Sequence, residues 1–307
     1  MTEIILHHYP QSPVAEKVRV GLGVKKLDWR SVEIPRMPPK PDLMPLTGGY
    51  RRTPVMQIGA DIYCDSQCIL REIDRRHPEP TFAPGGGQGM PWALSRWTDF
   101  TLFDQVVRVV LGYAADEMPQ DLLEDRARLY FGPDCDMQAV KDSLPHTVAQ
   151  LRAQFGWVNE RLSYGRDFLL VEPGLPDILV YHLVWFLRGR WEGSADFMSE
   201  FPALEAWEAR MKAIGHGQST DMPSGEALEI AKNSEPQTPE TSDSRDPQHL
   251  EPGMSVNVVP EGDGGDPMVS GIVHAVSRES IAILRSDDRV GRVCVHFPRV
   301  GYMVAKL

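Results

Sequence analysis

Apolar and polar positions alternate in short blocks over the first part of the chain. Two apolar runs around Gly59 and Ala60 predict a tight hairpin, and a run that begins at Pro13 predicts a helix, because proline suits the first helical position. Residues 35–52 are too rich in proline for a helix or a central strand. The predicted elements are, in order, a strand at 4–8, a helix at 13–24, a strand at 29–34, a hairpin at 54–63 and a helix at 66–76.

This order, βαβ followed by ββα, is that of a thioredoxin-like α/β domain, whose parallel half requires a right-handed crossover. We predict this domain over residues 1–80. After a glycine-rich stretch at 84–87 the pattern becomes helical. Apolar residues in 144–162 recur at intervals of three and four, and residues 177–187 are apolar on nearly all sides, which predicts a buried helix. We therefore predict an all-helical domain over residues 90–232.

The last part of the chain changes character twice. Residues 233–251 are rich in Pro, Ser, Thr and acidic residues with almost no apolar residue, which predicts a flexible linker. Five short apolar runs separated by turns then predict a small antiparallel β-barrel over residues 252–307. Its sequence contains no motif that indicates a role.

Composition and charge exclude several classes of function. The formal net charge is −11 and no run of Lys or Arg occurs, so we expect no nucleic-acid partner. The N-terminal segment lacks the apolar stretch of a signal peptide, and the longest apolar run, 178–187, is too short to span a bilayer. The 4 cysteines are too scattered for a disulfide framework or a zinc site, so we expect no metal. These features predict a cytoplasmic protein with no membrane partner.

A set of local motifs follows one order along residues 3–215. These are Ser12-Pro13 followed by Glu16-Lys17-Val18-Arg19, then Thr53-Pro54, Asp65-Ser66, Pro176-Asp177-Ile178, and Phe201-Pro202 up to Trp207. Together with the predicted domain order, they resemble the cytosolic glutathione transferase family, in its serine-type form. The resemblance implies glutathione as co-substrate, a small electrophilic molecule as second substrate, and a homodimer. It does not extend to the C-terminal strands.

The resemblance places Ser12 at the glutathione sulfur, where the family has a Ser, Tyr or Cys near the end of the first strand. Glutathione reacts as thiolate, whereas a free thiol has a pKa of about 8.5. A hydroxyl that donates a hydrogen bond to the thiolate contributes about 1.5–3 kcal/mol, and a helix N-terminus adds roughly 0.3–1 kcal/mol. Together these interactions lower the thiol pKa by about 1–3 units.

Other interpretations of this segment are open. Ser12 also suits a purely structural N-cap, and the two roles share one geometry. Tyr9 is the alternative hydroxyl donor, followed by His8. Residues 12–15 contain no cysteine, which argues against thioredoxin, glutaredoxin and the cysteine-type transferases.

The resemblance also implies how the rest of the tripeptide is held. Pro54 corresponds to the family's cis-proline, which turns the backbone of Thr53 outward to pair with the cysteinyl part of glutathione. Ser66 and the first N–H groups of its helix would receive the γ-glutamyl carboxylate, and Asp65 would pair with the ammonium. A helix cap is the competing role for Asp65 and Ser66. The candidate cations for the glycyl carboxylate are Lys40, Arg51 and Arg52.

Asp177 matches the start of the family's buried helix. The family has Ser or Thr three residues earlier, but this chain has Gly174, so the reciprocal capping box is incomplete. We interpret this motif as a feature of folding and not of catalysis.

The function expected from these motifs is conjugation of glutathione thiolate to an electrophile. The alternative is a non-catalytic glutathione-binding or protein-interaction module on the same fold, which the extra C-terminal segment favours. A third hypothesis places the function in the barrel and makes the transferase fold a dimeric scaffold.

Overall fold

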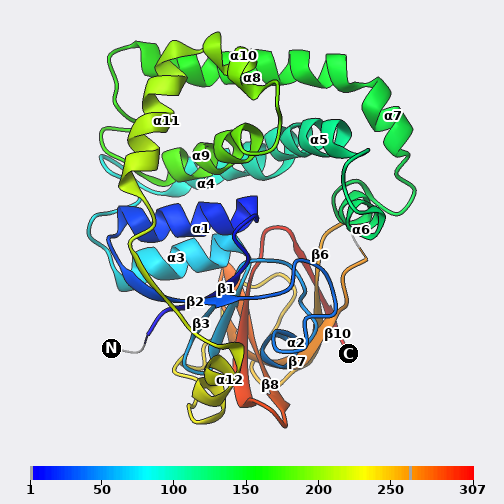
Figure 1. Cartoon of the computed structure of the whole chain (residues 1–307). Helices are drawn as coiled ribbons and strands as arrows, with labels where there is room; N and C mark the ends of the chain where they lie inside the picture. Colours follow the sequence, from blue (N-terminus) through cyan, green and yellow to red (C-terminus); the bar gives the residue numbers. More distant parts are fainter. Residues whose placement is uncertain (1–2, 263–264) are drawn as a thin grey trace. The chain divides into compact units, whose positions relative to one another are not determined.

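The computed structural model describes residues 3–262 and 265–307 (Figure 1). The contacts within the chain divide it into two compact units. The first unit comprises Met1–Val18, Leu27–Ile73 and Gln218–Leu307, and the second comprises Arg19–Lys26 and Asp74–Gly217.

The first unit is built on one ten-stranded sheet, counted over the described residues, in the order β10-β6-β7-β8-β9-β4-β3-β1-β2-β5. Strand β1 is parallel to β2 and antiparallel to β3, and β3 is antiparallel to β4, as a thioredoxin-like sheet requires. The strands are β1 (Ile5–His8), β2 (Asp28–Glu33), β3 (Val55–Ile58), β4 (Asp61–Cys64), β5 (Gln218–Asp221), β6 (Ser255–Pro260), β7 (Val269–Val276), β8 (Ser280–Asp287), β9 (Gly291–Pro298) and β10 (Tyr302–Lys306). The helices that lie wholly or partly in this unit are α1 (Pro13–Val24), α2 (Met44–Thr47), α3 (Ser66–Arg76) and α12 (Ser224–Lys232).

The predicted fold class is confirmed, and the structure adds how the C-terminal strands are attached. All five predicted strands are present as β6–β10, and they extend the N-terminal sheet because β9 pairs in parallel with β4. One core runs through both groups of strands, with Ile5 and Ile62 in the same apolar cluster as Val258 and Phe297. The N-terminal and C-terminal strands therefore share a hydrophobic core.

Two local features of the first unit differ from the sequence pattern. The proline-rich stretch contains one short helix, α2, which tolerates Pro45 because the proline lies in its first turn. Strand β5 pairs in parallel with β2 although all of its residues are exposed. A strand without a buried face has no apolar alternation by which to detect it.

Residues 233–251 are mainly irregular and make defined contacts with the sheet. Thr241 forms a bridge to Ala275, and the backbone N–H of Gln237 donates to Asp61. The flexibility of this segment and the domain boundary at residue 252 remain predictions.

The second unit is helical, as predicted. Helix α9 is buried over nearly its whole length, which explains its nearly uninterrupted apolar sequence. None of the helices in the described residues combines the length and the apolar character needed to cross a bilayer. The helices are α4 (Gly89–Arg96), a π-helical turn η1 (Trp97–Thr101), α5 (Leu102–Ala114), α6 (Gln120–Phe131), α7 (Met137–Asp142), α8 (Leu144–Ser163), α9 (Leu175–Arg188), α10 (Ser194–Ser199) and α11 (Pro202–Ile214).

The start of α9 explains the incomplete capping box. Asp177 Oδ2 accepts from the backbone N–H of Gly174 at 3.1 Å, and Oδ1 accepts from Leu169 N and Trp207 Nε1, each at 2.8 Å. Burial raises the pKa of Asp177 to about 6 despite these donors. A Cβ atom at position 174 would lie 2.8 Å from the carbonyl oxygen of Phe82, so Ser or Thr does not fit there. Asp177 thus retains its half of the box and gains two further donors.

Candidate functional site

Ser12 is buried between the end of β1 and the first residue of α1. Its Oγ accepts a hydrogen bond from the backbone N–H of Ala15 at 3.1 Å, so Ser12 is the N-cap of the helix. This bond uses a lone pair of the hydroxyl oxygen and does not use its hydrogen. The cap therefore leaves the O–H able to donate to another group, and the capping and donor roles are compatible.

The alternative donors on β1 and just beyond it have other contacts. The Tyr9 ring is buried, and Lys40 Nζ lies 5.7 Å from its centroid. His8 Nε2 lies 3.1 Å from Ser31 Oγ, while His7 Nε2 lies 2.9 Å from Gln57 Oε1. The two histidines thus have different partners, as expected for neighbours on a strand that face opposite ways.

The Thr53–Pro54 peptide bond is cis, as the resemblance implied. Beside it, the buried Lys40 donates from Nζ to Thr53 Oγ1 at 3.0 Å and to the Arg51 carbonyl at 2.9 Å. Arg52, in contrast, is engaged by the carboxylate of Asp266, with its Nε 3.1 Å from both oxygens. Of the three candidate cations, Lys40 thus contacts Thr53, whereas Arg51 Nε lies 3.8 Å from Asp266 Oδ1.

Asp65 and Ser66 open helix α3. Asp65 Oδ1 accepts from the backbone N–H of Gln67 at 2.8 Å, which confirms the capping role, and Asp65 has a positive φ of 76°. Ser66 is buried, and its Oγ accepts from Lys17 Nζ at 3.0 Å. A cation and a helix N-terminus therefore occur together at Ser66, and both favour an anion.

Asp65 has a further partner that the sequence did not suggest. The hydroxyl of Tyr302, the first residue of β10, lies 3.0 Å from Asp65 Oδ2. Nothing in the sequence links the two positions, because 237 residues separate them.

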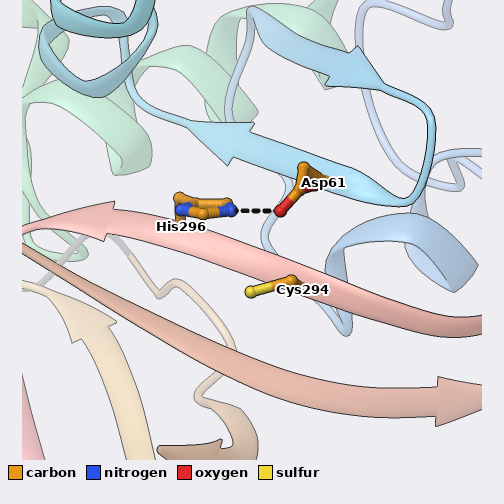
Figure 2. A group of neighbouring side chains, drawn as sticks. All are labelled: Asp61, Cys294 and His296. Atoms are coloured by element: carbon orange, nitrogen blue, oxygen red, sulfur yellow. Dashed lines mark hydrogen bonds and ion pairs between the residues drawn. The ribbon is translucent and has the colours of Figure 1, made fainter. Parts of the chain in front are cut away.

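A second polar cluster lies on β4 and β9 (Figure 2). Asp61 is opposite Cys294 in the register of the two strands, and its side chain lies close to His296. One ligand atom from each residue lies within 4.8 Å of the others, and these residue types are ligands of zinc in proteins. Asp61 Oδ1, however, accepts from His296 Nε2 at 2.9 Å and Thr238 Oγ1 at 2.6 Å, and Oδ2 accepts from Gln237 N at 2.7 Å.

The electrostatics of this cluster fit a hydrogen-bond network. Burial alone would raise the pKa of Asp61, but the bonds from His296 and Thr238 outweigh it and hold that pKa below its usual value. Burial raises the pKa of the Cys294 thiol, which is therefore protonated. The ionised Asp61 binds residues 237–238 to the start of β4.

Comparison with known families gives two matches along the chain. Residues 6–81 match the model of the glutathione S-transferase N-terminal domain, and residues 141–210 match that of the glutathione S-transferase C-terminal domain. Among curated proteins, no sequence matches this chain.

Solved structures extend the comparison to the whole chain. A GST-like protein from Pseudomonas syringae is 37% identical, with full coverage of both chains and a TM-score of 0.80. FzlA from C. crescentus is 20% identical, with 76% of this chain and 94% of that chain covered and a TM-score of 0.52. A glutathione S-transferase from Methylobacillus flagellatus with glutathione bound is 22% identical, with 69% and 99% covered and a TM-score of 0.50.

The last two similarities concern the fold alone, whereas the first covers every element described above, including β6–β10. The two domain matches coincide with the thioredoxin-like strands and with part of the helical unit. The chain therefore belongs to the glutathione transferase family.

Proposed function

We propose that this protein binds glutathione in its first unit and, through Ser12, activates the thiol as thiolate for attack on a small electrophile. The observation that carries the proposal is the Ser12 hydroxyl at the N-terminus of α1, whose capping bond to Ala15 uses only a lone pair. A charge-assisted bond from this hydroxyl, worth about 1.5–3 kcal/mol, lowers a thiol pKa by about 1–2 units. That shift makes thiolate a major species at neutral pH.

The remaining subsites are proposed for the other parts of the tripeptide. The backbone beside cis-Pro54 pairs with the cysteinyl residue, and Lys40 receives the glycyl carboxylate. Ser66 and the N-terminus of α3 receive the γ-glutamyl carboxylate, with Lys17 contributing positive charge. Asp65 pairs with the γ-glutamyl ammonium.

The test must separate the donor role of Ser12 from its capping role. Ser12→Gly removes the hydroxyl and costs a helix only a few tenths of a kcal/mol, because glycine is tolerated at the N-cap. Ser12→Thr retains both the hydroxyl and the cap. The purified full chain is loaded with glutathione, and the thiolate is followed by its ultraviolet absorbance as pH is varied.

We expect the apparent thiol pKa of bound glutathione to rise by about 1–2 units in Ser12→Gly and to stay close to wild type in Ser12→Thr. Equal pKa values in all three proteins would remove the catalytic role of Ser12 and favour a glutathione-binding module. Failure of the wild-type chain to bind glutathione would refute the whole proposal.

From family membership we further propose a cytoplasmic homodimer. Light scattering of the purified chain tests the dimer, and fractionation of cells tests the location. A monomer, or a chain recovered outside the cytoplasm, would contradict this part of the proposal.

A further inference from the structure

We propose that the C-terminal strands complete the glutathione site, with Tyr302 as a positioning residue that holds Asp65 ready for the γ-glutamyl ammonium. This inference rests on the proposed function. It gives a role to the C-terminal strands, whose sequence contains no motif that indicates one.

The hydrogen bond between the two side chains has one direction. Tyr302 Oη lies 3.0 Å from Asp65 Oδ2 and 3.3 Å from Tyr50 Oη. The single O–H of Tyr302 donates to Asp65 Oδ2. The Tyr302 oxygen can then accept from Tyr50, which gives the chain Tyr50 to Tyr302 to Asp65. All three residues lie in the first unit.

Both oxygens of Asp65 are therefore held, each by a different part of the fold. Oδ1 accepts from Gln67 N, which belongs to the first turn of α3, and Oδ2 accepts from Tyr302. Two fixed bonds remove the rotational freedom that the carboxylate would otherwise lose on binding.

The backbone of Asp65 also needs support from its surroundings. Its φ of 76° lies in the left-handed region, which is uncommon for residues other than glycine. Such conformations persist where the surrounding structure holds them in place, and they are frequent at ligand sites.

The aromatic ring that carries the donor is itself fixed. Tyr302 is buried, with its ring centroid 5.6 Å from that of Phe297 on β9 and 6.4 Å from that of Tyr50. Burial raises the pKa of Tyr302 well above its ordinary value, so the hydroxyl keeps its proton and remains a donor.

The part of the chain from Thr238 onward thus contacts β4 at its first residue and just after its last. His296 and Thr238 bind Asp61 at its start, and Tyr302 binds Asp65 immediately after its last residue, Cys64. Between these points β9 pairs with β4 along its length.

The test uses two ligands that differ only at the group in question. Glutathione carries the γ-glutamyl ammonium, and glutaryl-cysteinyl-glycine has hydrogen in its place. Calorimetry on the full chain measures both affinities for wild type, Tyr302→Phe and Asp65→Asn, with Tyr164→Phe at an exposed position as the matched control. Tyr302→Phe keeps the buried ring, and circular dichroism checks that it folds.

We expect Tyr302→Phe to weaken glutathione binding about ten-fold, which is about 1.4 kcal/mol, and to leave the affinity for the glutaryl ligand unchanged. Asp65→Asn, which retains the buried aromatic cluster, should likewise weaken the binding of glutathione and leave the affinity for the glutaryl ligand unchanged. Equal affinity of wild type and Tyr302→Phe for glutathione, or equal losses for both ligands, would overturn the inference and leave the proposed function standing. If wild type does not bind glutathione, the proposed function fails and the inference fails with it.

Discussion

The carboxylate of Asp61 attaches residues 237–238 to the sheet, and its loss has a measurable local effect. Asp61 is fully buried, and its two oxygens accept from Thr238 Oγ1, Gln237 N and His296 Nε2. In Asp61→Asn the volume is kept, but one acceptor oxygen becomes an NH₂ donor that faces other donors. At least one charge-assisted bond, worth about 1.5–3 kcal/mol, is therefore lost.

If this free energy is lost from the local attachment, opening of the segment becomes about 10–150-fold more frequent. The Gln237 amide reports this opening directly, because its N–H donates to Asp61 in the closed state. Hydrogen exchange of this amide, followed by mass spectrometry or NMR on the full chain, gives the change.

Glu240→Ala is the matched control, since Glu240 lies in the same segment and is exposed. Its exchange at Gln237 should equal that of wild type. Unchanged protection of the Gln237 amide in Asp61→Asn would show that Asp61 does not hold this segment, and the reasoning would be refuted.

Two further predictions concern His7 and Lys40. Burial lowers the pKa of His7 from 6.5 to about 4, so the neutral form is favoured in the folded state and stability falls as pH decreases through this interval. When the pH is lowered from ~7.5 to ~5, the free energy of unfolding measured in urea should fall by about 2 kcal/mol less in His7→Gln than in wild type. An equal fall in both proteins would show that His7 is not the group responsible. Lys40→Met should lower the affinity for glutathione about ten-fold. The affinity for γ-glutamylcysteine, which lacks the glycyl carboxylate, should not change. Calorimetry with both ligands checks this, and a parallel loss for both would assign Lys40 a structural role.

Local sequence determined the elements whose chemistry is contained within a few residues. The Ser12-Pro13 pair begins a helix because a hydroxyl can cap the first turn and proline suits the next position. The run 177–187 is buried because it has almost no polar face, and the helix α9 that contains it is the one that the pattern predicted. The strands β6–β10 were also visible as apolar runs between turns.

Partners that are distant in the chain could not be predicted in this way. The apolar pattern of β9 shows that it is a buried strand, but it does not specify which edge it pairs with. In a thioredoxin-like unit alone, β4 would be an edge strand with unpaired N–H and C=O groups, and β9 satisfies them. The two C-terminal side chains that act on β4 and its end, His296 and Tyr302, come into place only through that pairing and its continuation.

The sequence by itself thus determined the helices, most strands and the position of the hydroxyl at Ser12, because capping, periodicity and turn chemistry act over a few residues. Only the tertiary structure decided that the last strands join the first sheet and that Tyr302 donates to Asp65. The physical reason is that strand pairing and buried hydrogen bonds join residues far apart in the chain, and no local pattern encodes the identity of the partner.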